Sequence, residues 1–190
     1  MGYEIKESNI TTRQQFRLWL EENGNTEKEV WLQLKRGKPT SEHEFWYVDA
    51  VEEALCFGWI DSTLKRKDGL SYQRFSPRSK KSNWTEKNKE RVRRLEALGL
   101  MTEQGRNVCP SLEEYEFDSE FVSFLEKENL WTKFLEYPPL YQWIKASTIT
   151  GYKKDKEKYQ KSMDRLMNEI QEGKLVGDWD DYGRLTNYLK

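Results

Sequence analysis

The chain has 190 residues with a formal net charge of −1 at pH 7, and 34% of its residues are charged while 36% are hydrophobic. This length fits one domain, or one domain with a helical extension, and an aromatic content of 14% with eight tryptophans predicts a core of few but large side chains beneath a very polar surface. No apolar run approaches the ~20 residues of a membrane helix and "MGYEIKESNI" is not a signal peptide, which predicts a cytoplasmic protein without membrane insertion.

The first 46 residues predict one helix and one strand. Apolar residues in "FRLWL" have helical spacing, which predicts a helix over residues 12–22 that ends at "ENGN". In "EVWLQLKR", Val30, Leu32 and Leu34 alternate with their neighbours as in a strand. The Gly and Pro content of "GKPTSEHE" then indicates a loop.

A second helix and a hairpin follow. Val48, Val51 and Leu55 form one apolar stripe of a helix over residues 47–57, and Gly58 stands where a left-handed residue would end it. "WIDSTLKR" and "SYQRFS" flank "KDGL", and an Asp-Gly pair between two alternating runs predicts a β-hairpin. On its first strand, residues 59, 61 and 63 should face one way and residues 60, 62 and 64 the other.

The remainder reads as helical. We predict a helix over residues 86–98, an acidic loop in "PSLEEYEFD", and short helices around residues 121–125, 130–135 and 140–146. A long charged helix over residues 150–171 carries an apolar stripe of Tyr159, Met163, Leu166, Met167 and Ile170. The acidic loop is the most plausible internal boundary, which divides the chain into an α+β region, 1–109, and a helical region, 110–190.

Charge is segregated along the chain. Residues 61–94 contain twelve Lys/Arg and four Asp/Glu, whereas residues 95–136 contain three and ten. One interpretation is that these are solvated faces that neutralise each other in the fold. The other is an anion-binding patch in the basic segment.

Most catalytic motifs are absent. There is no Gly-rich phosphate loop and no Gly-x-Ser-x-Gly elbow. His43 is the single histidine, and Cys56 and Cys109 lack metal-ligand spacing, so we expect no metal and no cofactor. We interpret Cys56 as a core residue, and we place Glu52 and Glu53 on the largely exposed side of their helix as solvated acids.

One cluster around the hairpin remains as the candidate site. Its members are aromatic, cationic or hydrogen-bonding residues: Trp59, Asp61, Tyr72, Arg74, Pro77, Arg78, Ser82 and Trp84. An aspartate that follows a core helix and a tryptophan needs a partner if it is buried, and arginine supplies one through its bidentate fork. The hairpin could bring Asp61 and Arg74 close across the ladder.

Two interpretations of this cluster stay open. In the first, Asp61 and Arg74 form a partly buried pair that locks the hairpin, and the tryptophans only pack. In the second, Arg74 and Arg78 meet a phosphate, a carboxylate or a stacked base beside Trp59 or Trp84, and Asp61 orients a guanidinium group or a substrate hydroxyl. The same residues would serve binding or catalysis.

The residue pattern also resembles a known family. "ALCFGWID", Asp68, "YQRFSPR", Ser82, Trp84, Asn88, Leu95, Gly99, Met101 and Gly105 resemble the bacterial YdeI/OmpD-associated family, also called the bacteriocin-protection family. The match extends upstream through "VWL" and covers roughly residues 12–105, and "YPPLYQWIKAS" is similar to the family's Pro-led helix. The arginines that follow in the family are replaced here by "TITGYKKDK". The resemblance implies a role in stress or bacteriocin protection and supplies no catalytic residues.

Together these observations predict an α+β fold, a small antiparallel sheet flanked by helices, followed by a helical C-terminal region. The leading hypothesis is a stress- or protection-related protein that binds a small anionic ligand or a protein partner through residues 59, 61, 72, 74, 78, 82 and 84. One alternative is an enzyme on a small phosphorylated or carboxylated substrate with Asp61 as acid or base. Another is a nucleic-acid binder that uses the basic segment 65–94.

Overall fold

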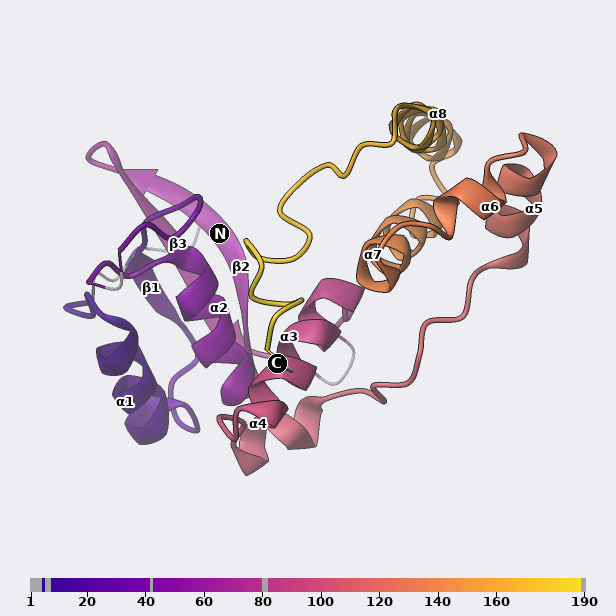
Figure 1. Cartoon of the computed structure of the whole chain (residues 1–190). Coiled ribbons are helices and arrows are strands. Elements are labelled where there is room, and N and C mark those ends of the chain that lie inside the picture. Colours follow the sequence, from indigo (N-terminus) through magenta and orange to yellow (C-terminus); the bar gives the residue numbers. More distant parts are fainter. Residues whose placement is uncertain (1–4, 6–7, 42, 80–81, 189–190) are drawn as a thin grey trace. The chain divides into compact units, whose positions relative to one another are not determined.

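The computed structural model describes residues 5, 8–41, 43–79 and 82–188 (Figure 1). Its elements in chain order are α1 (Arg13–Asn23), β1 (Val30–Gln33), α2 (Tyr47–Cys56), β2 (Trp59–Lys67), β3 (Leu70–Pro77), α3 (Glu86–Ala97), α4 (Glu103–Val108), α5 (Ser119–Lys127), α6 (Trp131–Phe134), α7 (Pro139–Thr150) and α8 (Lys156–Glu172). The three strands form an antiparallel sheet in the order β1-β3-β2. The predicted α+β class with a helical C-terminal region is confirmed.

The chain forms two compact units. Unit 1 comprises Met1–Asn83 and Arg91–Ser111, and unit 2 comprises Trp84–Glu90 and Leu112–Lys190, so that α3 contributes residues to both. The sequence predicted regions 1–109 and 110–190. In the structure the main boundary lies after residue 111, and residues 84–90 belong to the C-terminal unit as well. None of the helices in the described part of the chain has the length and apolar character that a membrane crossing requires.

In unit 1, two glycine-containing junctions have the predicted conformations. Gly58 has a φ of 74°, which confirms it as the left-handed residue between α2 and β2. Asp68 and Gly69 have φ values of 51° and 79°, as a two-residue hairpin turn between β2 and β3 requires. Helix α1 packs its aromatic residues on this sheet, because the Phe16 and Phe75 rings lie 5.4 Å apart.

The strand alternation predicted for β2 is wrong beyond Asp61. Asp61 pairs with Phe75 and Leu64 pairs with Gln73, so three steps along β2 match two steps along β3. This one-residue excess is a β-bulge, which turns the following side chains over to the other face. Leu64 therefore shares the sheet face of Asp61, whereas the sequence placed it on the opposite face.

The predicted exposure of Glu52 and Glu53 is also wrong. Their side chains are only 0% and 3% exposed. Arg94 from α3 and Arg13 from α1 hold Glu52 at 2.7 and 3.0 Å. Arg13 and Arg17 from α1 hold Glu53 at 2.6 and 2.9 Å. The side of α2 that the sequence left to solvent is thus covered by cationic side chains of two other helices.

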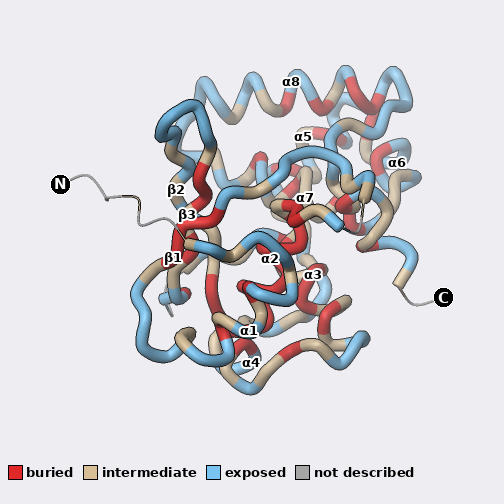
Figure 2. Tube along the Cα trace, turned by 90° about the vertical axis from the view of Figure 1, so that its left-hand side faces the viewer, coloured by how far each residue is buried: buried red, intermediate tan, exposed pale blue. Residues whose placement is uncertain are grey.

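Unit 2 is built from helices around one apolar core. Its fully buried members include Phe121, Phe134, Met163 and Ile170. Figure 2 shows buried and exposed segments alternating along α8, which fits the predicted apolar stripe. The start predicted for this helix at residue 150 is wrong, because α7 continues to residue 150 and α8 begins at residue 156, where the Asp155 side chain accepts a hydrogen bond from the Lys158 amide at 3.1 Å.

Replacing Glu52 by Gln tests the buried network. The substitution removes the charge that balances Arg13 and Arg94, and breaking a buried ion pair from one side costs several kcal/mol. We expect E52Q to lower the free energy of unfolding by about 3 kcal/mol in urea denaturation. The control is E21Q, which breaks the more exposed Arg17–Glu21 pair and should cost less than about 1 kcal/mol. Equal effects of the two changes would contradict a buried network.

Gly105 should be intolerant of any side chain. A Cβ atom there would lie 2.3 Å from the Cys56 carbonyl oxygen, so α4 could not approach the end of α2. Gly99 has a positive φ of 68° but open space around it, so G99A would cost only backbone strain of about 1–2 kcal/mol. We expect G105A to lower the melting temperature more than G99A does. A smaller shift for G105A would show that α4 can move away without loss.

Candidate functional site

Asp61 is the centre of the candidate site. It is the third residue of β2, it is half-buried, and its carboxylate accepts a hydrogen bond of 2.6 Å from the Tyr47 hydroxyl. Tyr47 is the first residue of α2, so the junction at Gly58 places the start of the helix beside the start of the strand. Burial, reinforced by the negative charge of Asp61, raises the pKa of Tyr47 well above its ordinary value.

Arginine side chains surround the Tyr47–Asp61 pair. The Arg36 guanidinium lies over the Tyr47 ring at 4.2 Å from its centroid, and its Nη2 donates to the Gln73 side-chain oxygen. Arg78 is buried, with an exposed fraction of 7%, and its Nη1 donates to the Asn83 carbonyl oxygen at 3.2 Å. Burial lowers the pKa of Arg78, and the charge of Asp61 opposes that shift.

These four residues, Asp61, Tyr47, Arg36 and Arg78, all belong to unit 1 and are called the Asp61 site below. Their two guanidinium groups and one carboxylate carry an excess of positive charge. Arg36 is exposed while Arg78 is buried, so the site has one arginine open to solvent and one held within the protein. Arg36 contacts Tyr47 and Arg78 interacts electrostatically with Asp61, and the positive charges of both arginines favour an incoming anion.

The pairing expected between Asp61 and Arg74 is corrected by the strand register. Asp61 lies opposite Phe75, so Arg74 points from the other face of the sheet. There the Arg74 Nε donates to Glu29 at 2.7 Å, and its Nη1 contacts the Ser62 hydroxyl at 3.0 Å. Arg74 thus joins β3 to the residue that precedes β1.

Trp59 and Tyr72 are both buried in unit 1. Trp59 is 1% exposed, its Nε1 donates to the Gly24 carbonyl oxygen at 3.1 Å, and its ring meets Trp19 edge to face at 5.5 Å. No face of this indole is open to a stacked base. Tyr72 is 7% exposed and borders a cavity of about 420 Å³ that His43 also lines.

Ser82 and Trp84 follow β3 in the chain. The Ser82 hydroxyl accepts a hydrogen bond of 3.1 Å from the Ser79 amide and closes a turn. Trp84 is half-buried and belongs to unit 2. Of the seven residues proposed from the sequence, the structure therefore relates Asp61 and Arg78 electrostatically, and it uses Trp59 and Arg74 in packing and pairing.

Tyr47 and Arg36 were missed as site residues. Tyr47 opens a helix whose apolar stripe was recognised, and Arg36 ends the run "EVWLQLKR" that was assigned to a strand. A helix that ends in a left-handed glycine and returns as a strand brings its own first turn near that strand, which was the available signal for Tyr47. No local pattern marks Arg36.

The chemistry of the site favours holding a ligand over transferring a proton. A general acid works best when its pKa lies near the working pH, whereas the pKa of Tyr47 is raised from 10.0. Tyr47 therefore keeps its proton and acts as a fixed donor to Asp61. Within the described residues, no three His, Cys, Asp or Glu side chains are placed to hold a metal ion.

Comparison with known families gives one match. A family model described as "Domain of unknown function (DUF8412)" covers residues 8–108, which include the whole Asp61 site. Searches of curated proteins and of solved structures returned no match. The matched segment ends before the helices α5 to α8.

Replacing Tyr47 by Phe tests the hydrogen bond at the centre of the site. Loss of a hydrogen bond to a charged, half-buried carboxylate should lower the free energy of unfolding by about 1–2 kcal/mol at pH 7. Because the folded-state pKa of Tyr47 is raised above 10.0, its contribution is present below pH 10 and is lost as the pH rises further, and Y47F should lack this loss.

The matched control is Tyr152→Phe, since the Tyr152 hydroxyl makes no hydrogen bond within the described part of the chain. Urea denaturation of Y152F should differ from the unchanged protein by less than about 0.5 kcal/mol. If Y47F changed the free energy of unfolding as little as Y152F does, the Tyr47–Asp61 hydrogen bond would contribute nothing to the fold and would have no positioning role.

Proposed function

This chain belongs to the DUF8412 family, and from the geometry of the segment that defines it we propose that the protein binds an anionic ligand or partner at the Asp61 site. The observation that carries the proposal is the placement of Arg36 over Tyr47, which itself is held by Asp61 beside the buried Arg78. Three protein groups thereby orient one another before any ligand arrives. Preorganised donors bind anions more strongly than flexible ones, because less side-chain entropy is lost.

Each residue has a distinct part in this proposal. Arg36 supplies the exposed guanidinium group that meets a phosphate or carboxylate oxygen. Arg78 adds positive charge from a fixed, desolvated position. Asp61 holds the Tyr47 hydroxyl in place, and its negative charge limits the site to ligands whose anionic group does not approach it closely.

The cellular role belongs to the same proposal. The residues between 12 and 105 that resemble the YdeI/OmpD-associated family support a cytoplasmic protein of stress or bacteriocin protection. Under this proposal the bound anion is the signal or the partner's contact group, and the protein acts through binding.

An enzyme acting on a small phosphorylated or carboxylated substrate is the second candidate, and the 2.6 Å Tyr47–Asp61 bond is the observation that favours it. Asp61 would serve as acid or base there. If the protein is an enzyme, D61N should abolish substrate turnover while substrate binding persists. If it is a binding protein, the unchanged protein should show no turnover either.

Arg36→Gln is the direct test of anion binding. We expect inorganic phosphate, compared with chloride at equal ionic strength, to raise the melting temperature of the unchanged protein, and R36Q to weaken phosphate binding roughly tenfold. The matched control is R66Q, an exposed arginine on the β2–β3 hairpin. Retained phosphate stabilisation in R36Q would refute the Asp61 site. If phosphate stabilisation were lost in R66Q and kept in R36Q, the result would favour the nucleic-acid alternative. Affinity for a nucleic acid should then fall steeply as the salt concentration rises.

A further inference from the structure

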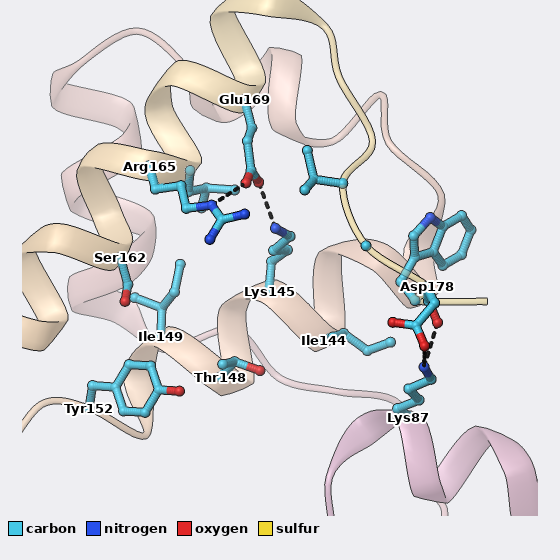
Figure 3. Close-up of a pocket in the computed structure, with 14 residues that line it drawn as sticks. Lys87, Ile144, Lys145, Thr148, Ile149, Tyr152, Ser162, Arg165, Glu169 and Asp178 are labelled. Carbon is cyan, nitrogen blue, oxygen red and sulfur yellow. Dashed lines mark hydrogen bonds and ion pairs between the residues drawn. The ribbon is translucent and has the colours of Figure 1, made fainter. Parts of the chain in front are cut away.

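Unit 2 contains a cavity that the sequence did not indicate. Its volume is about 410 Å³, and it is bordered by α7, α8 and the segment that follows α8 (Figure 3). This volume falls in the range of small-molecule pockets, roughly 300–1,000 Å³. Part of the lining is apolar and is formed by Ile144, Ile149, Leu166, Val176 and Trp179. The cavity can therefore accommodate the apolar part of a small ligand.

Charged groups gather at one side of this cavity around Glu169. Figure 3 shows Lys145 and Arg165 approaching this carboxylate from α7 and α8. The Lys145 Nζ lies 2.6 Å from Glu169 Oε2, and the Arg165 Nε lies 3.0 Å from Oε1. Glu169 is buried, and the Tyr141 hydroxyl also donates to it at 3.1 Å. Two cations and one carboxylate leave one positive charge here, and the other charged residues of the lining, Lys87 and Asp178, pair with each other.

The Arg165 side chain has binding capacity left over. Its Nε is engaged by Glu169, whereas its two Nη groups make no hydrogen bond within the described part of the chain. The side chain is 71% exposed and borders the cavity beside Ser162, one turn earlier on α8. Two parallel Nη donors match the two oxygens of a carboxylate.

The wall formed by the segment after α8 is held in place. The Val176 amide donates to the Tyr141 hydroxyl at 3.3 Å, which in turn donates to Glu169. Lys87 lies 2.7 Å from Asp181 and 3.5 Å from Asp178, and it anchors the same segment from the first turn of α3. The apolar wall and the charged side are thus parts of one connected structure.

We propose that this cavity binds a small carboxylic acid with an apolar body, such as an arylalkanoate. The Arg165 Nη groups hold the carboxylate, and the apolar body lies against Leu166, Val176 and Trp179. The single excess positive charge matches a monoanion. A phosphate dianion is disfavoured because it would bring a second negative charge close to Glu169 and would leave the apolar wall uncovered.

Calorimetric titration of the full chain with phenylacetate tests this site. We expect binding of phenylacetate and not of phenylacetamide, which has the same ring without the charge. Replacing Arg165 by Gln should weaken phenylacetate binding roughly tenfold to a hundredfold, because a hydrogen-bonded charge partner is lost. The fold should survive R165Q, since this side chain is mostly exposed.

The matched control is Lys161→Gln. Lys161 is another exposed cation of α8, and it forms an ion pair with Glu157. K161Q should bind phenylacetate as the unchanged protein does. Absence of phenylacetate binding, equal binding of the amide, or equal weakening by K161Q and R165Q would each overturn the proposal. Phenylacetate binding that R36Q weakens and R165Q leaves unchanged would place the ligand at the Asp61 site instead and would also overturn the proposal.

Discussion

The burial of two carboxylates on α2 is the constraint on which unit 1 depends. Glu52 and Glu53 are adjacent and almost completely enclosed, so each carboxylate needs a cation beside it to offset the hydration it has lost. Arg13, Arg17 and Arg94 supply that charge from α1 and α3. The three helices must therefore keep one mutual arrangement, because a shift of any of them would leave a buried charge without its counter-charge.

This arrangement also positions the Asp61 site. Helix α2 carries Tyr47 at its first residue and the buried acids near its middle, so fixing the helix fixes the tyrosine hydroxyl. Gly58 then reverses the chain into β2 and brings Asp61 within 2.6 Å of that hydroxyl. The site is consequently a product of core packing, and its arginines add to a pair that the fold has already oriented.

Unit 2 also contains a buried carboxylate paired with cations, but its cations lie in a different setting. Glu169 is also a buried carboxylate, but its partners Lys145 and Arg165 lie at a cavity rather than between packed helices. In unit 1 the guanidinium groups of Arg13, Arg17 and Arg94 join α1 and α3 to the buried acids of α2. In unit 2 one guanidinium keeps two donor groups beside an apolar space, which is why a ligand site is inferred there.

The amino-acid sequence by itself determined the elements whose signals are local: the hairpin at Asp68 and Gly69, the helix stop at Gly58, and the apolar stripe of α8. It could not decide the partner of Asp61, because a single bulge and the strand register set which side chains share a face. It also placed Glu52 and Glu53 in solvent, since adjacent acids have the same pattern whether or not distant arginines cover them. Those contacts join residues about forty positions apart, and only the tertiary structure brings them together.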